Sequence, residues 1–269
     1  MAVKIENAVN LGDRMKYYES VYNTTLKTGM PVIIRLDGRA FHTFTKRFVK
    51  PFDKVFVETM CGTMLYLCRN IAHCVFGYTQ SDEITLVLLD YDTEESKPWL
   101  NYRTQKLCSL SAAMATAVFN RLYEKNVKAL GEKDRYVLRD TGELELAMFD
   151  SRCFNITEED VVNCLIWRQR DAQRNSVSAM AHKYLTKAEV YKCNTAELRK
   201  MIKEKTGLSW EDYPIGLQRG FCAVRKPVEI HTENGVAVRK KWLLDSDIPI
   251  FEENKAYITE IIMRSKLED

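Results

Sequence analysis

The hydrophobic pattern of the N-terminal part of the chain predicts four strands and two helices. Strand-forming residues gather in four apolar stretches, and two longer segments carry apolar residues at helical spacing. The stretches are 32–36, 73–79, 84–89 and 146–156, and the helical segments are 53–68 and 102–125. The order is β-α-β-β-α-β, which predicts an α+β fold with helices packed on a ferredoxin-like antiparallel sheet.

Acidic residues lie at the ends of two of these strands. Asp37 follows the first strand, and Asp82 and Glu83 come just before the third. In the split βαβ arrangement these strands are antiparallel neighbours, so Asp37 and Asp82 should meet. Two ionised carboxylates about 4 Å apart repel by roughly 1–4 kcal/mol, and Mg²⁺ offsets such repulsion. The pattern favours a two-metal nucleotidyl-transfer site over two solvated acidic turns.

Residues able to bind phosphate lie near these acids in the sequence. Gly38 has no side chain, so residues 38–42 can present backbone amides to a triphosphate, although Asp-Gly is also a common turn. Basic side chains follow at Arg39, Lys46, Arg47, Lys50, Arg103 and Lys106. Such side chains bind phosphates if the fold brings them to the acids and otherwise form a solvated face.

The chain after Asn175 is predicted to extend the catalytic core. Residues 1–175 hold the regular alternation of strands and helices, whereas residues 176–269 hold charged helical sequence, a hairpin and a final helix. The hairpin joins 221–224 to 236–238, and the final helix covers 252–263. No linker rich in Pro, Gly or Ser separates the two parts, so we expect the extension to pack on the core.

Two basic clusters suit a nucleic acid. Residues 167–175, predicted to end a helix, contain Arg168, Arg170 and Arg174. The second cluster lies on or near the hairpin and consists of Arg219, Arg225, Lys226, Arg239, Lys240 and Lys241. Arginine side chains stack on bases and pair with phosphates, but composition alone leaves RNA binding and a solvated surface equally open.

The composition is that of an ordinary globular protein. Hydrophobic residues make up 46% and charged residues 29%, and a net charge of +3 confines any nucleic-acid surface to a local patch. The eight cysteines form no C-x-x-C pair, and neither a signal peptide nor a membrane span is visible, so we expect reduced cysteines in a cytoplasmic protein. The four histidines lack zinc-site spacing, and neither G-x-S-x-G nor a Walker motif occurs.

An ordered set of short segments resembles the tRNA-histidine guanylyltransferase superfamily. The segments are 35–42 (RLDGRAFH), 50–53 (KPFD), 80–83 (QSDE), 149–150 (FD), and 167–169 (WRQ) with Asp171 and Asn175. The set spans about residues 30–175 and is specific. From there to Lys226 the match is looser, and residues 227–269 are unassigned.

The resemblance implies a polymerase-type palm that adds nucleotides to the 5′ end of tRNA, in the direction opposite to ordinary polymerases. ATP or GTP activates the 5′-monophosphate, and the 3′-hydroxyl of an incoming nucleoside triphosphate then attacks the activated end. By position, Asp37, Asp82 and the Gly38 carbonyl would hold two Mg²⁺ ions, with Glu83 as the accompanying catalytic acid. The triphosphates would contact Ser81, Lys50, Arg103 and Lys106, and the nucleotide site would be lined by Arg39, Ala40, Phe41 and His42.

One departure from the family pattern bears on the substrate. Members devoted to tRNA-histidine carry a His-Ile-Asn-Asn or His-Ile-Asn-Thr stretch, where this chain has Gln173, Arg174, Asn175 and Ser176. Variants lacking it resemble template-dependent repair enzymes for 5′-truncated tRNA, and we favour that subgroup. Guanylate addition to tRNA-histidine is the alternative. The resemblance also implies a homotetramer built as a dimer of dimers.

Two further classes of protein compete with this hypothesis. A nucleotidyl cyclase shares the two metals and two carboxylates but attacks its own triphosphate, and the arginine-rich segment ending at Asn175 favours a polynucleotide acceptor instead. A non-catalytic RNA-binding module needs no acidic cluster among phosphates. Cyclic product from GTP without RNA would favour the first class, and tight tRNA binding without nucleotide incorporation would favour the second.

Overall fold

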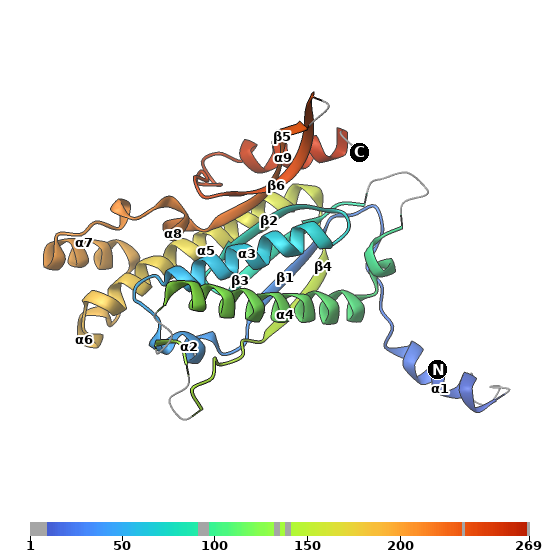
Figure 1. The fold of residues 1–269 in the computed structure, drawn as a ribbon, viewed down its shortest axis with the longest axis horizontal. Coiled ribbons are helices and arrows are strands. Elements are labelled where there is room, and N and C mark those ends of the chain that lie inside the picture. The colour runs from blue at the N-terminus through green and yellow to red at the C-terminus, as the bar shows by residue number, and fades with distance from the viewer. Residues whose placement is uncertain (1–9, 91–96, 132–134, 138–140, 233–234, 268–269) are drawn as a thin grey trace.

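The protein is built on one six-stranded antiparallel sheet. The computed structural model describes residues 10–90, 97–131, 135–137, 141–232 and 235–267 (Figure 1). The strand order is β4-β1-β3-β2-β5-β6, and each neighbouring pair is antiparallel. The strands are β1 (Val32–Gly38), β2 (Cys74–Gln80), β3 (Glu83–Leu88), β4 (Phe149–Asn155), β5 (Phe221–Thr232) and β6 (Gly235–Asp245). The first four strands have the predicted palm-like α+β arrangement.

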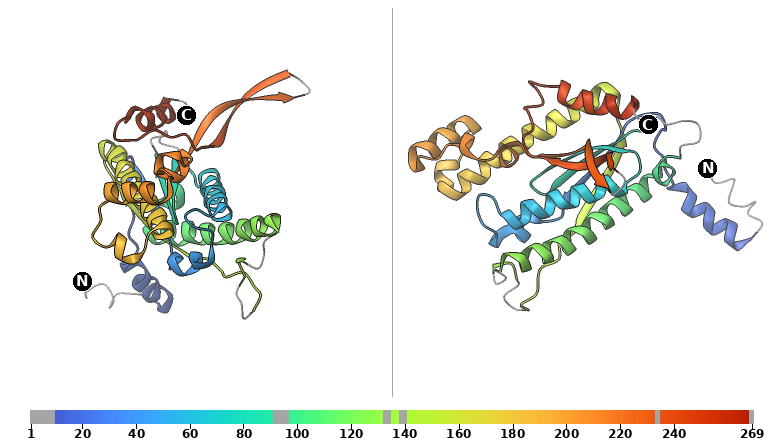
Figure 2. Two further views of the ribbon diagram at one scale, coloured as in Figure 1. Left: turned by 90° about the vertical axis from the view of Figure 1, so that its left-hand side faces the viewer. Right: turned by 45° about the horizontal axis from the view of Figure 1, so that its top comes forward.

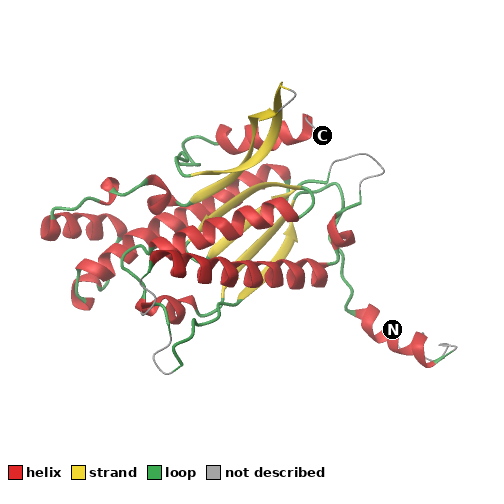
Figure 3. Ribbon diagram, in the orientation of Figure 1, coloured by secondary structure: helices red, strands yellow, loops and turns green. Residues whose placement is uncertain are grey.

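Helices cover both faces of the sheet (Figure 3). On one face, α3 (Lys54–Asn70) and α4 (Thr104–Leu130) bury Met64, Leu107 and Phe119 against Ile34 and Leu36 of β1. On the other face, α5 (Glu158–Tyr184) and α9 (Ala256–Leu267) pack against a second apolar cluster, which includes Ile33, Tyr78 and Val87. Alternate residues of β1 therefore enter two different cores, as the period of a strand requires.

The second half of α5 supports a smaller lobe. Five further helices are α1 (Leu11–Val21), α2 (Phe41–Phe44), α6 (Lys187–Val190), α7 (Thr195–Thr206) and α8 (Ile215–Arg219). Short 3₁₀ segments cover Thr45–Arg47, Trp99–Tyr102 and Trp210–Asp212. Val177 and Met180 of α5 pack with Leu198 and Ile202 of α7 and with Trp210. In Figure 1 this lobe extends beyond one end of the sheet, and α1 extends beyond the other.

Asp53 is the residue at which helix α3 begins. Its carboxylate accepts hydrogen bonds from the backbone amides of Phe56 (3.0 Å) and Val49 (2.9 Å) and from the hydroxyl of Tyr136 (3.1 Å). The first bond caps α3, a contact that typically contributes about 1 kcal/mol. The other two hold the segment before the helix, so Asp53 fixes the loop that carries Lys50.

Two elements differ from the sequence prediction. The helix expected to end at Asn175 continues to Tyr184, so α5 spans both sides of the boundary expected between residues 175 and 176. The last palm strand begins at Phe149 rather than at Leu146, which is 70% exposed and packs on no core. The hairpin and the final helix are present, and both strands of the hairpin are longer than expected.

All eight cysteines are free. Within the described ranges, no helix is both long and apolar enough to cross a membrane.

Candidate active site

The ends of β1 and β3 meet at one edge of the sheet, as predicted. Asp37 pairs across the ladder with Glu83, and the Gly38 amide donates a hydrogen bond of 3.1 Å to the Asp82 carbonyl. Ser81 and Asp82 form the two-residue turn between β2 and β3, with Ser81 at φ 49°. This turn sets Asp82 beside the end of β1.

Both aspartates have raised pKa values, and the charge of Asp37 contributes to the shift at Asp82. Burial is the largest cause that raises the pKa of Asp82, and the charge of Asp37 is the next that raises it. Burial also raises the pKa of Asp37, followed by the charge of Asp150, while nearby arginines oppose the shift. Both carboxylates are therefore harder to ionise than an ordinary aspartate, and a cation between them would lower their pKa values.

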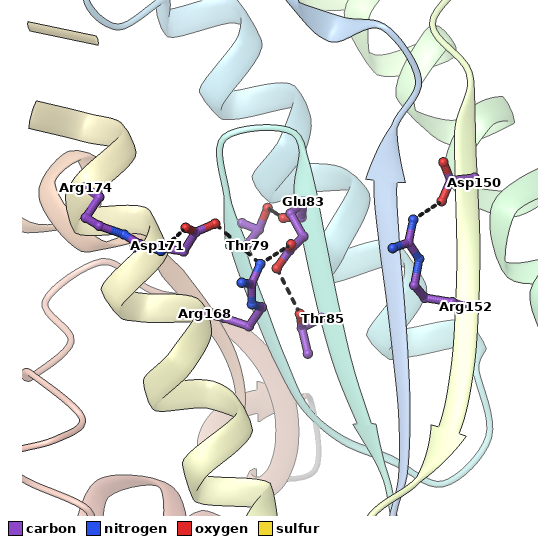
Figure 4. A network of polar contacts seen from close by, with 8 residues as sticks. All are labelled: Thr79, Glu83, Thr85, Asp150, Arg152, Arg168, Asp171 and Arg174. Carbon is purple, nitrogen blue, oxygen red and sulfur yellow. Dashed lines mark hydrogen bonds and ion pairs between the residues drawn. The ribbon is translucent and has the colours of Figure 1, made fainter. Parts of the chain in front are cut away.

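Asp150 is a third acid in this region that sequence reasoning did not assign to the site. It lies opposite Asp37 on β4, and its carboxylate pairs with Arg152 at 3.0 Å on the exposed surface (Figure 4). The order of the strands could have placed Asp150 there, because the last strand of a βαββαβ sheet borders the first. Phe149 and Asp150 begin that strand, so they lie beside Gly38 and Asp37.

Glu83 is held by α5 through a buried ion pair. Arg168 donates a hydrogen bond of 2.7 Å to its carboxylate, and both side chains are less than a tenth exposed. The Thr85 hydroxyl donates to the same carboxylate at 3.4 Å, and Arg168 also reaches Asp171 at 3.5 Å (Figure 4). Arg168 lies 3.6 Å from the Trp167 ring centroid. In the described part of the chain, no group of three or more His, Cys, Asp or Glu side chains is arranged to hold a metal ion.

The segment after Asp37 divides between the core and the surface. Phe41 is 4% exposed, and its ring contacts those of Phe44, Phe119 and Phe149, so its side chain anchors the segment instead of lining a nucleotide site. A Cβ at Gly38 would collide with the Phe41 ring, which explains the glycine. Arg39, Ala40 and His42 are exposed, and the charge of His42 lowers the pKa of Asp82.

A cavity of about 200 Å³ opens beside the Ser81 turn. Its wall includes Lys50 and Ser81, two residues predicted to contact triphosphates, together with Gln80, Asn175 and apolar side chains. The apolar part comprises Phe48, Phe52, Phe56, Val57, Met60 and Phe221. Lys50 is exposed, and its ammonium group donates a hydrogen bond of 3.0 Å to the Thr45 carbonyl. An engineered apolar cavity of about 150 Å³ holds benzene, so this one has room for a nucleobase.

The structure does not bring Arg103 and Lys106 to this cavity. They lie at the start of α4, on the face of the sheet opposite the one that Asp37 and Glu83 share. The neighbouring Thr104 carbonyl accepts a 3.6 Å contact from Cys153, which pairs with Ile34 toward the other end of β1. Asp37, Asp82 and Glu83 form what we call the carboxylate edge of the sheet. Within one chain the two cations are therefore separate from this edge.

The carboxylate edge and part of the cavity wall fall in a region shared with a protein family. Residues 12–157 match the family model described as tRNAHis guanylyltransferase, which is more than half of the chain. The chain belongs to the tRNAHis guanylyltransferase family. The matched region contains Asp37, Lys50 and Asp82, and the family assignment makes the protein a nucleotidyltransferase.

Relatives of the tRNAHis guanylyltransferase family match almost the whole chain. A bacterial guanylyltransferase-like protein in complex with ATP is 32% identical, with a TM-score of 0.80, over 94% of this chain and 98% of that chain. A bacterial guanylyltransferase-like protein in complex with GTP is 34% identical, with a TM-score of 0.75, over the same shares. A probable tRNA(His) guanylyltransferase of Dictyostelium discoideum is 26% identical over 82% of this chain and 86% of that relative.

Proposed function

We propose that the protein adds nucleotides to the 5′ end of tRNA in the 3′-to-5′ direction, guided by the opposing strand, and so repairs 5′-truncated tRNA. The observation that carries the proposal is the Asp37–Asp82 edge beside a cavity lined by Lys50 and Ser81. The family relatives in complex with ATP and GTP support nucleoside triphosphates as substrates.

The carboxylate edge suits magnesium. Its two aspartates have raised pKa values, and a hard cation relieves the repulsion that contributes to the shift. Mg²⁺ is commonly held by one or two carboxylates plus substrate phosphates and water, so a third acid is not required. Asp37, Asp82 and the Gly38 carbonyl would hold the two ions. When bound, the ions would polarise the attacking and leaving oxygens of a phosphoryl displacement.

Two displacements complete the reaction. In the first, an oxygen of the tRNA 5′-monophosphate bonds to the α-phosphorus of ATP or GTP, and pyrophosphate leaves. In the second, the 3′-hydroxyl of an incoming nucleoside triphosphate bonds to the activated 5′-phosphorus and loses its proton, and the nucleoside monophosphate leaves. Lys50 and Ser81 would bind the triphosphate at the cavity, where a lysine acts as a point charge.

The hairpin β5–β6 offers a surface for the tRNA. It projects from the body in Figure 2, and Lys226 lies directly opposite Lys241 across its ladder. Directly opposed like charges destabilise a ladder; Asp245 pairs with Lys226 at 3.4 Å, and bound phosphates would offset the remaining positive charge. Arg225, Lys240 and Arg239 continue the basic surface, and all three are exposed.

The residues at the position of the family's His-Ile-Asn-Asn stretch favour repair over guanylate addition. Arg174 pairs with Asp171 at 2.6 Å, and Ser176 donates a hydrogen bond of 2.8 Å to the Gln218 carbonyl, so both have internal partners. Asn175 lines the cavity from α5. This wall would therefore contact a nucleotide without the histidine of the tRNA-histidine enzymes.

We also propose that the protein is a homotetramer, built as a dimer of dimers. We propose that it is located in the cytoplasm, a reducing compartment in which free cysteines persist. Helix α1 supplies a surface for assembly, because none of its residues is buried in one chain. Leu11, Met15, Tyr18 and Tyr22 are exposed and form a stripe at helical spacing.

Labelled nucleotides offered to 5′-truncated and full-length tRNA test the proposed activity. With Mg²⁺ and ATP, we expect incorporation into truncated tRNA when the added base matches the opposing strand, and little with a mismatched acceptor strand. Preference for full-length tRNA-histidine, independent of the opposing base, would contradict the repair function. Cyclic nucleotide formed from GTP without RNA would contradict the polymerase class.

A further inference from the structure

Gln80 has an unusual amide for a buried glutamine. It is 7% exposed, lines the cavity, and makes no side-chain hydrogen bond to any residue that the structure describes. Buried polar groups are normally paired, but among the described residues the amide of Gln80 is not one of the unpaired polar groups that are shut off from solvent. The amide of Gln80 is therefore reached by solvent at the cavity, where a bound ligand can replace water as its partner.

Two other buried glutamines show the normal pattern. Gln169 donates to the Pro249 carbonyl at 2.9 Å and accepts from the Phe251 amide at 2.8 Å. Gln218 also lines the cavity, but its amide donates to the backbone carbonyls of Glu211 and Tyr213. Gln80 differs from both, because its donor and acceptor are available to a ligand.

The position of Gln80 restricts what that ligand is. It directly precedes Ser81 and Asp82, so a triphosphate at the turn would place its base or its sugar near this amide. The cavity wall around it is rich in phenylalanine, which suits a planar base rather than a charged phosphate. Lys50 and Ser81 lie on the same wall and supply the polar contacts for phosphate.

We propose that Gln80 reads the base of a purine nucleoside triphosphate and accepts both adenine and guanine. This inference rests on the proposed function, which puts the nucleotide in this cavity. A carboxamide has one donor and one acceptor side by side. In one orientation it accepts from the adenine amino group and donates to N1. Turned by 180°, it donates to the guanine O6 and accepts from the N1 proton.

Substitution of Gln80 by Glu tests this pairing because it changes the hydrogen-bonding pattern. A carboxylate only accepts, so it matches the guanine N1 proton and amino group but leaves the adenine N1 without a donor. In Gln80→Glu we expect the ratio of GTP to ATP affinity to rise by about tenfold. In Gln80→Leu we expect both affinities to fall by about tenfold, with their ratio unchanged.

The experiment measures dissociation constants of ATP, GTP and inorganic tripolyphosphate for the full chain with Mg²⁺ and without tRNA. Tripolyphosphate has no base, so its affinity should be the same in wild type and Gln80→Leu. The matched control is Gln169→Met, a buried glutamine outside the cavity, which should lower the Tm and leave the GTP to ATP ratio unchanged. Thermal unfolding of each Gln80 variant verifies that it is folded.

Two results would overturn the role of Gln80: unchanged ATP and GTP affinities in Gln80→Leu, or an equal loss of tripolyphosphate affinity. If these occur while the wild-type protein extends truncated tRNA, the inference alone fails. If the wild-type protein binds none of the three probes, the proposed function fails together with it.

Discussion

The charged forms of Asp37 and Asp82 are disfavoured at the positions that these two residues occupy. Burial raises both pKa values, and the charge of Asp37 adds to the shift at Asp82. A carboxyl group whose pKa is raised in the folded state loses stabilising free energy as the pH rises from its ordinary pKa through the raised one. The metal-free protein should therefore gain stability when one of these charges is removed.

The variant Asp82→Asn tests this trade-off between stability and activity. We expect a higher Tm than wild type in EDTA at neutral pH, with the difference disappearing as the pH falls below about 3.8, the ordinary value for aspartate. Nucleotide addition should fall more than about 100-fold, since even loss of a residue that orients a metal ligand costs 10–100-fold. A lower Tm in EDTA would contradict the electrostatic explanation. Wild-type activity would contradict metal binding.

The pair of Glu83 and Arg168 should act as a positioning unit. Removal of one partner from a buried ion pair costs about 3–5 kcal/mol, so Arg168→Met should destabilise the protein by about that amount. Because Glu83→Gln removes the charge left behind, the double variant should be more stable than the sum of the single effects predicts. Denaturant unfolding of all four proteins gives the coupling, and additive effects within about 0.5 kcal/mol would contradict it.

At the residue scale the sequence predicts where the acidic residues lie, but it does not predict which side chains each of them contacts. Asp37 and Asp82 could be predicted to meet because one lies at the end and the other just before the start of a strand with a clear apolar pattern. The role of Glu83 depends on Arg168, which lies 85 positions later on a helix whose orientation no local pattern reveals. Phe41 resembles a loop residue in the sequence. In the structure four other aromatic rings pack around it, and Gly38 has no side chain to block it.

At the scale of elements, the β5–β6 hairpin belongs to the same sheet as the carboxylate edge. The pairing of Gly77 with Ala223 continues the sheet from β2 into β5. A Cβ at Gly77 would press on Cys68, Met64 and Ala223, so the glycine permits close packing at this join. The sequence predicts the hairpin from its turn, but the join depends on a contact between distant segments.

The basic hairpin should contribute to tRNA affinity through phosphate contacts. Lys240→Ala and Lys241→Ala are each expected to weaken tRNA binding and to reduce the slope of log affinity against log salt by about 1. The matched control is Lys54→Ala on α3, an exposed lysine paired with Glu58 at 3.7 Å. Filter binding at several salt concentrations measures the slopes. Equal slopes for the control and the hairpin variants would contradict the assignment.

At the scale of the whole molecule, α1 should contribute to assembly. Met15→Asp puts a charge in the exposed apolar stripe and should shift the protein from tetramers to smaller species in light scattering. Lys16→Asp changes the other side of the helix and should leave the mass unchanged. Since α1 buries no residue in one chain, neither variant should lower the Tm of the smaller species. A tetrameric Met15→Asp protein would contradict this role.

The account as a whole depends on one metal-dependent site at the edge of a palm-like sheet. Crystals grown with Mn²⁺ and a non-hydrolysable ATP analogue test it most directly, because anomalous scattering locates the ions. The account predicts ions between the carboxylates of Asp37 and Asp82, in contact with the triphosphate, and no ions there in Asp37→Asn crystals. Ions bound elsewhere, or a triphosphate away from both carboxylates, would contradict it.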